Sequence, residues 1–446
     1  MKAIKLLGYA LMAMTCSAVL VGCGDDKDEV ITQQGGQQGG QQGGQQGGDP
    51  TNTTTMTMSE QKAYLEQTAR ELENKVKASD FQVLSDLFQY VRDNYTNKGK
   101  YSNGRYDMDV LEEWFDNAVK ACEVGTPSNK TIRRLLTTAN FTGLFSAGPN
   151  GWQKDGTADY LQFTFRDRSG NNCVLRVVAS ANYTPAHHNI LDEEEYHWDY
   201  NTYTKVLDSR YENVIGVPQT VNVTLTQGAN TLVDTKVTTS LSMRTQEVDL
   251  SSDNYTVSVD AKVCGYQVLV DRANFIGDQN LSVTTTVLKG SETLVWAQAS
   301  ANGKVRLNSN KEFSVKEAGQ ATASVNVLGK VQVRGTVSSI DDFIDYNEEA
   351  KDNRRDENLF KDCLNKANAL LNLNVYYNNS SASSAQCKML ASAYRAYDGT
   401  RWEAAPALFF NDGTSYSFES FFDETTFKHV TNNFETLLED FEDMFK

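Results

Sequence analysis

The sequence lacks the short motifs that mark the common enzyme classes. It contains no Gly-x-Ser-x-Gly nucleophile turn, no glycine-rich phosphate loop and no Cys-His pair at a recognisable spacing. There is no Cys-x-x-Cys, so neither a dithiol redox site nor a zinc knuckle is indicated. Pairs of Asp and Glu are too common in this acidic chain to identify a glycosidase dyad. The sequence therefore predicts no catalytic residue, no metal ligand and no cofactor, and it favours a non-enzymatic protein.

Positive charge is scarce. The 446 residues include 42 Lys and Arg against 58 Asp and Glu, a formal net charge of −16. Removing residues 1–22 takes away Lys2 and Lys5 and no acid, which leaves 40 basic and 58 acidic residues and a charge of −18. An acidic protein is repelled by phosphate and by anionic headgroups. Nucleic acid is therefore excluded as a partner, and electrostatic docking to a membrane is disfavoured.

The N-terminus has the layout of a secretory signal. Lys2 and Lys5 precede an apolar run from Leu6 to Val21, which is too short to span a bilayer. The run ends in Leu20-Val-Gly-Cys23, which resembles the lipobox of bacterial lipoproteins. In that family cleavage precedes the cysteine, so the resemblance implies a signal peptide over residues 1–22. It also implies lipid attachment at Cys23, with outer-membrane lipid as the partner. An uncleaved N-terminal anchor is the alternative.

A tether of residues 23–57 is predicted to follow the signal. Its acidic start, Gly24-Asp-Asp-Lys-Asp-Glu29, resembles the export signal of surface lipoproteins in the Bacteroidota, and this likeness implies a location on the cell exterior. A solvated charge run explains the same residues. Four copies of Gln-Gln-Gly-Gly then occupy residues 33–48. Without apolar residues this stretch stays flexible, with a root-mean-square span of roughly 30 Å.

The folded body is predicted to be α+β. One-sided apolar stripes at spacings of three and four predict helices within residues 58–140, among them Ile132, Leu135 and Leu136. Residues 141–338 alternate with a period of two, which predicts a wide, curled antiparallel sheet of about 10 to 12 strands. Its strands are predicted to form repeated hairpins that turn at Gly170, Gly228 and Gly290.

The C-terminal region, residues 339–446, returns to the helical period. Amphipathic stripes predict helices after Ser339, and short β-like segments follow between Leu373 and Phe410. A final stripe of large apolar residues between Phe427 and Phe445 predicts a closing helix. These helices and the N-terminal ones are expected to cover the apolar face of the sheet.

Five cysteines lie beyond the lipobox. Because five is an odd number, at least one stays unpaired unless it bridges two chains. Buried free thiols are the favoured role for those on apolar periodic faces. The five are Cys122, Cys173, Cys264, Cys363 and Cys387.

One segment is chemically dense. Residues 182–210 interrupt the strand pattern and are predicted to form an acidic loop that holds His187, His188 and His197 among several carboxylates. Imidazoles and carboxylates in one loop can converge on Zn²⁺ or Ca²⁺. The spacing matches no zinc motif and no EF-hand loop, so a surface insertion explains the same residues.

Three functions fit these observations. The favoured one is a surface-anchored lipoprotein that binds an apolar, glycan or protein ligand without catalysis. The alternatives are a secreted hydrolase or metal-dependent enzyme that uses the segment around His187 to His197, and a structural or adhesive subunit. An apolar ligand would need a space between the helices and the concave face of the sheet, lined by residues such as Val223, Leu225, Val237 and Val259. Such an arrangement is similar in outline to lipoproteins that carry lipid in an unclosed barrel.

Overall fold

The computed structural model describes residues 56–95, 110–128, 130–148, 151–307, 313–397 and 399–417. The predicted signal peptide and nearly all of the predicted tether lie outside these ranges. The stripe predicted between Phe427 and Phe445 lies outside them as well.

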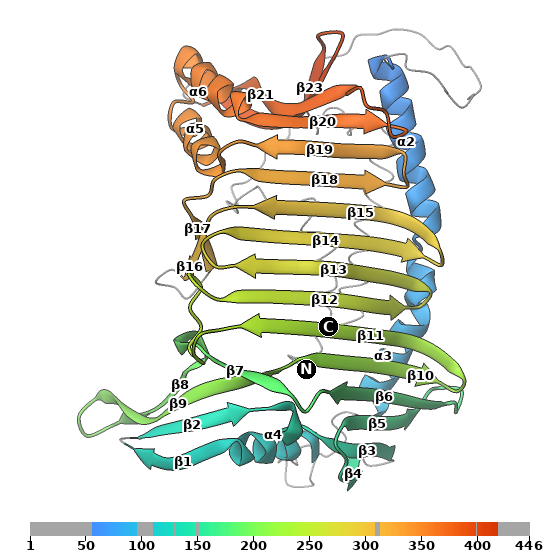
Figure 1. The fold of residues 1–446 in the computed structure, drawn as a ribbon, viewed down its shortest axis with the longest axis vertical. Coiled ribbons are helices and arrows are strands. Elements are labelled where there is room, and N and C mark those ends of the chain that lie inside the picture. The colour runs from blue at the N-terminus through green and yellow to red at the C-terminus, as the bar shows by residue number, and fades with distance from the viewer. Residues whose placement is uncertain are drawn as a thin grey trace.

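The fold is built on one sheet of sixteen strands (Figure 1). All neighbours pair antiparallel except β3 and β5, which are parallel. The α+β class and the wide antiparallel sheet are thus confirmed. The sheet is wider than the predicted 10 to 12 strands because four strands after the expected β region, β20 to β23, join it. In order across the sheet, the strands are β23 (Ser415–Ser417), β22 (Gly399–Phe410), β21 (Ala385–Ala396), β20 (Leu371–Tyr377), β19 (Val331–Val337), β18 (Ala321–Val327), β15 (Glu292–Ala301), β14 (Asn280–Lys289), β13 (Tyr266–Ile276), β12 (Asn254–Val263), β11 (Asn230–Ser242), β10 (Thr220–Gln227), β6 (Asn172–Ala179), β5 (Leu161–Arg166), β3 (Gly143–Gly148) and β4 (Gly151–Gly156).

The three predicted hairpin turns are present, and two further glycine turns follow the same plan. Gly170, Gly228 and Gly290 have φ values of +81°, +59° and +62°, a region that glycine occupies without steric cost. Gly265 and Gly329 occupy equivalent turns between β12 and β13 and between β18 and β19. Because the strands alternate in direction, all five turns lie at one end of the sheet.

Strand pairing joins side chains of one kind across many strands. On β12, Val259 lies opposite Val237 of β11 and Val270 of β13, so apolar residues continue from strand to strand. The neighbouring Ser258 lies opposite Thr238 and belongs to the other face. Because side chains alternate along a strand, the sheet has one apolar face and one polar face.

Two N-terminal helices run across the strands at the end where the glycine turns lie (Figure 1). They are α2 (Met58–Lys75) and α3 (Gln82–Tyr95), joined by the short 3₁₀ helix η1 (Ala78–Phe81). A capping box begins α2: Thr57 N–H donates to Glu60 Oε2 over 2.8 Å, and the Thr57 hydroxyl accepts from Glu60 N–H. This pattern, Thr followed three residues later by Glu, is readable in the sequence.

The helices meet the strands in spatial order. Gln61 donates to the carbonyl of Ser384 beside β21, and Glu71 pairs with Lys330 at the β18–β19 turn over 2.6 Å. Asp80 accepts from Lys289 at the β14–β15 turn over 2.7 Å. The N-terminal segment therefore crosses the strands in the order in which they lie in the sheet.

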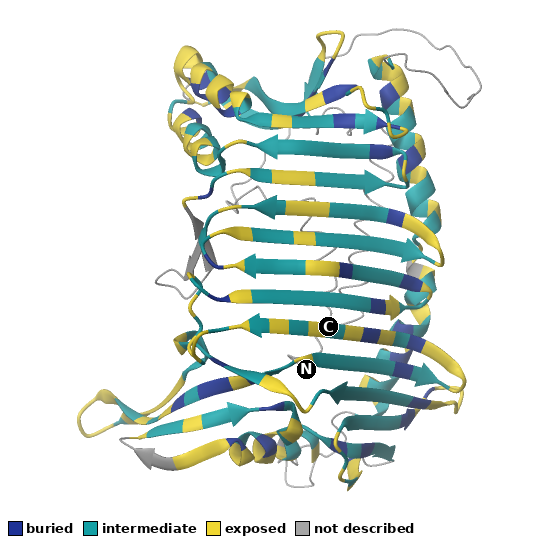
Figure 2. Cartoon of the chain, viewed as in Figure 1, coloured by how far each residue is buried: buried dark blue, intermediate teal, exposed yellow. Residues whose placement is uncertain are grey.

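Burial is concentrated beneath these helices (Figure 2). Leu84 and Leu87 of α3 pack into the largest cluster of buried side chains, where Phe145 and Leu225 are each 1% exposed. A second cluster lies under α2 at β19 to β22. A third lies under the helices α5 (Ile340–Asp352) and α6 (Glu357–Ala369), which cover part of β21 and β22.

A smaller sheet corrects two expectations. The segment that contains Ile132, Leu135 and Leu136 is strand β2 (Thr131–Leu136), not a helix, and it pairs in parallel with β9 (Thr204–Pro218). Its apolar residues fit either period, and the run is too short for a stable helix, so the pairing decides. The helical region before it ends with α4 (Val110–Ala121). Strand β1 (Glu123–Ser128) precedes β2 at the edge of this sheet.

Residues 182–210 are largely strands rather than an acidic loop. They include β7 (Tyr183–His187) and β8 (Glu193–Asp199), and both pair with β9. A strand can hold these acidic side chains because basic and hydroxyl groups on the neighbouring strand pair with them or donate hydrogen bonds to them. Arg210 pairs with Glu194 over 3.0 Å, and Tyr211 donates to Glu195 over 2.9 Å.

Candidate functional site

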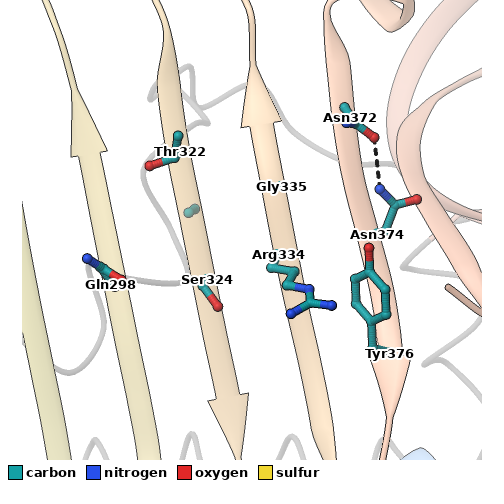
Figure 3. A pocket seen from close by; sticks show the side chains of 9 residues that line it. Gln298, Thr322, Ser324, Arg334, Gly335, Asn372, Asn374 and Tyr376 are labelled. Atoms are coloured by element: carbon teal, nitrogen blue, oxygen red, sulfur yellow. Dashed lines mark hydrogen bonds between the residues drawn. The ribbon is translucent and has the colours of Figure 1, made fainter. Parts of the chain in front are cut away.

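A hollow of about 360 Å³ opens on the polar face of the large sheet (Figure 3). It spans four adjacent strands, β15, β18, β19 and β20. Most of its lining residues have polar side chains, with amides, hydroxyls, one guanidinium and one phenol. The lining residues are Gln298, Thr322, Ala323, Ser324, Arg334, Gly335, Asn372, Asn374 and Tyr376.

Strand register brings these residues together. Gln298 lies opposite Ser324, Ser324 opposite Arg334, and Arg334 opposite Asn374, so four polar side chains form one row across four strands. Tyr376 is two residues beyond Asn374 and reaches Arg334 on the diagonal. Each of these residues is an ordinary polar residue in its own strand. They form a site only because the strands pair in this register.

Gly335 allows β19 and β20 to approach closely at this point. A Cβ atom on Gly335 would lie 1.8 Å from the carbonyl oxygen of Asn372, a distance that no real side chain tolerates. Residue 335 therefore has to be glycine for the two strands to pair as they do.

Arg334 lies over the ring of Tyr376. Its guanidinium carbon is 4.2 Å from the centre of the Tyr376 ring, within the range of a cation–π contact. Within the described ranges, no carboxylate lies within ion-pair distance of Arg334, and the lining of the hollow contains no Asp or Glu. The cation is thus held in place by an aromatic ring and not by an acid.

The amides around Arg334 retain hydrogen-bonding capacity. Asn374 Nδ2 donates to Asn372 Oδ1 over 2.9 Å, which leaves the nitrogen of Asn372 and the oxygen of Asn374 without a partner in the described part of the chain. At the margin, Gln332 donates to Ser324 over 3.3 Å and the hydroxyls of Ser300 and Thr322 are 2.7 Å apart. The hollow therefore presents both donors and acceptors to a ligand.

The histidines of residues 182–210 do not converge. His187 lies between two carboxylates, with Nδ1 2.6 Å from Glu247 and Nε2 3.1 Å from Asp192. His188 Nδ1 accepts from the Ile190 N–H, and His197 pairs with Asp208. Among the described residues, no group of three His, Cys, Asp or Glu side chains is arranged to hold a metal ion.

His187 connects β7 to the segment that precedes β12, and this connection depends on charge. Burial lowers the pKa of His187, but the hydrogen bonds to Glu247 and Asp192 outweigh burial and raise the pKa above its usual value of 6.5. A raised pKa stabilises the fold fully below about pH 6.5, and this stabilisation is lost as pH rises through the higher folded-state value.

We predict that His187→Gln loses this pH-dependent stability. Urea unfolding of the parent should show a free energy of unfolding that falls between pH 6 and pH 8.5, with on the order of 1 kcal/mol of the fall due to His187. The variant should lack that part of the fall, and Glu247→Gln should reduce it. If the free energy of unfolding of His187→Gln falls between pH 6 and pH 8.5 as much as that of the parent, the fall is not due to His187.

The five cysteines that follow Cys23 in the sequence are all free thiols, so the prediction of at least one unpaired cysteine is confirmed. Cys122, Cys173 and Cys363 are buried, and burial raises the pKa of each thiol. A buried thiol with a raised pKa is a poor nucleophile. The thiols therefore act as small core residues.

The predicted apolar space is partly filled. Leu225 is 1% exposed and packs with Leu84 and Leu87, so this part of the apolar face is core. Val223 and Val237 are half-buried on the same face. The polar hollow lies on the opposite face of the sheet.

A second hollow of about 510 Å³ lies beside α2. All of its described lining residues come from this one helix, and they include both acids and bases. They are Ala63, Glu66, Gln67, Arg70, Glu71, Asn74 and Lys75. One face of a single helix does not define a ligand, so the hollow at Arg334 is the stronger candidate.

Cys23 lies outside the described residues. Within the described part of the chain, none of the helices has the length and apolar character needed to cross a membrane.

No protein-family model, no curated protein and no solved structure matches the chain. A proposal about function therefore rests on the chemistry of these residues.

Proposed function

We propose that the protein is a lipid-anchored surface lipoprotein that binds a hydrophilic ligand on the polar face of its sheet, without catalysis. The observation that carries this proposal is the hollow around Arg334. The hollow is open and has a volume of about 360 Å³, which is room for one or two sugar rings laid against the sheet. Seven of the nine lining residues have polar side chains, which favours a ligand rich in hydroxyl groups, such as a saccharide.

The lining supports binding rather than reaction. General acid–base catalysis needs a group that exchanges protons, most often an imidazole or a carboxylate. Among the residues that line the hollow, the ionisable side chains are those of Arg334 and Tyr376, and arginine stays protonated. The separate partners of His187, His188 and His197 give no support to a hydrolase that uses that segment.

The proposed anchor determines where the polar face of the sheet lies relative to the membrane. The Leu20-Val-Gly-Cys23 tetrad supports lipid attachment at Cys23, and the Gln-Gln-Gly-Gly repeats support a flexible segment between Cys23 and the described body. A span of roughly 30 Å lifts the sheet clear of the lipid surface. A face of hydroxyls and amides then meets soluble or extended ligands outside the cell.

We predict that the double variant Asn372→Ala, Asn374→Ala binds its saccharide at least about tenfold more weakly than the parent, since each lost hydrogen bond contributes about 0.5 to 1.5 kcal/mol. The measurement is binding of the full chain to an array of oligosaccharides, followed by calorimetry on each hit. Asn222→Ala is the control, because Asn222 lies on the same polar face but on β10, outside the hollow. Binding that is unchanged in the double variant, or an array without any hit, would refute the proposed function.

A further inference from the structure

We infer that the hollow selects an acidic saccharide and that Arg334 binds the carboxylate of a uronic acid unit. This inference rests on the proposed function and specifies the ligand of the same site. The charged groups around Arg334 differ from those around Arg134, which also contacts a tyrosine ring.

Arg134 shows the same arrangement with the acid in place. Its guanidinium carbon is 3.5 Å from the centre of the Tyr211 ring, and it pairs with Glu123 over 3.6 Å and with Glu193 over 3.7 Å. Arg334 has the ring, but among the described residues no carboxylate lies within ion-pair distance of it. In a protein with 58 acidic residues, an arginine in a hollow whose described lining holds no acid offers a site for the carboxylate of a ligand.

The orientation of Arg334 leaves its donors available. A guanidinium that lies on an aromatic ring keeps its N–H groups at its edge, in the plane that matches a carboxylate in a bidentate pair. Arg334 also covers one face of Tyr376, so that face is closed to stacking by a sugar ring. Sites for neutral sugars commonly present an open aromatic face to the sugar ring. Here the guanidinium of Arg334 occupies that position and presents its N–H groups instead.

The remaining lining suits the rest of a sugar. A sugar ring that lies against the sheet would meet hydrogen-bond donors and acceptors there. They come from the amides of Asn372, Asn374 and Gln298 and the hydroxyl of Ser324. These groups bind hydroxyls but do not identify charge. Arg334 alone adds the requirement for an anion.

The net charge of the protein opposes this binding only weakly. Charges more than about 8 Å away are largely screened at physiological ionic strength. The lining itself contains no acid. The attraction of a carboxylate to Arg334 therefore outweighs its repulsion by distant acidic residues. The acidic surface still disfavours polyanions that bind without specific contacts.

The test uses a matched pair of ligands and the full chain. Trigalacturonate carries carboxylates, and its methyl ester has the same sugar rings without the charge. We expect calorimetry to show at least about tenfold weaker binding of the ester. Arg334→Gln should bind the two ligands about equally, and Arg334→Lys should fall between Arg334→Gln and the parent because lysine keeps the charge without the fork.

Arg176 is the matched control. It lies on β6 with its guanidinium carbon 3.7 Å from the centre of the Tyr160 ring, and it does not line the hollow. Arg176→Gln should leave trigalacturonate binding unchanged.

The outcomes separate the two claims. If the ester binds the parent as tightly as the acid does, the site takes saccharides and the inference about charge is wrong, while the proposed function stands. If acid and ester both fail to bind and the oligosaccharide array has no hit, the proposed function fails as well. If Arg176→Gln weakens binding as much as Arg334→Gln does, the assignment to Arg334 is wrong.

Discussion

Replacing Gly335 by alanine should destabilise the protein by about 3 kcal/mol, the upper part of the range for steric overfilling of a packed site. A Cβ atom would meet the Asn372 carbonyl oxygen at 1.8 Å and the Leu373 Cα at 2.8 Å. Both atoms belong to the backbone of β20, so they cannot rotate away as a side chain would. The strands have to separate, and the hollow changes shape with them.

Gly290→Ala is the control for this variant. Gly290 has a φ of +62° at a hairpin turn, and a Cβ atom there would have nothing within 4 Å. Its cost is the backbone preference alone, about 1 to 2 kcal/mol. Urea unfolding of both variants measures the difference. If Gly335→Ala is no less stable than Gly290→Ala, the close approach of β19 and β20 is not a constraint on this fold.

Replacing Cys23 by alanine should move essentially all of the protein from the membrane fraction to the soluble fraction. Stable anchoring by acyl chains needs at least two attachment signals, and the proposed acylated N-terminus supplies them at one residue. The measurement is fractionation of cells followed by mass spectrometry of the N-terminal peptide. Cys264→Ala, which removes a free thiol of the body, should fractionate as the parent does. Recovery of Cys23→Ala with the membranes would refute the lipid anchor.

The parts of the fold that the sequence predicts are those set by neighbouring residues. The glycine turns at Gly170, Gly228 and Gly290 follow from two strand-like runs and a residue that accepts positive φ. The alternation that separates the apolar face from the polar face is also local. The opposite case is the segment around Ile132: its local pattern allows a helix, and pairing with the distant strand β9 makes it a strand.

The candidate site was beyond prediction because it is a product of register. Gln298, Ser324, Arg334 and Asn374 become neighbours only through three successive strand pairings. A shift of one residue in any pairing would turn a strand over and remove its side chain from the row. The partners of His187 show the same limit. Asp192 is five residues from His187 in the sequence, but Glu247 is sixty residues away, so no local pattern pairs it with His187.

The path of α2 and α3 across the strands has a mechanical consequence. A pull on the body from its N-terminal side enters at Met56 and passes along α2, roughly perpendicular to the strands (Figure 1). The contacts of Gln61, Glu71 and Asp80 with successive hairpins then carry the load together, as shear along the helix. The load is then spread over the strands that form the hollow and their neighbours, so the hollow should resist deformation when the body is pulled from its N-terminal side.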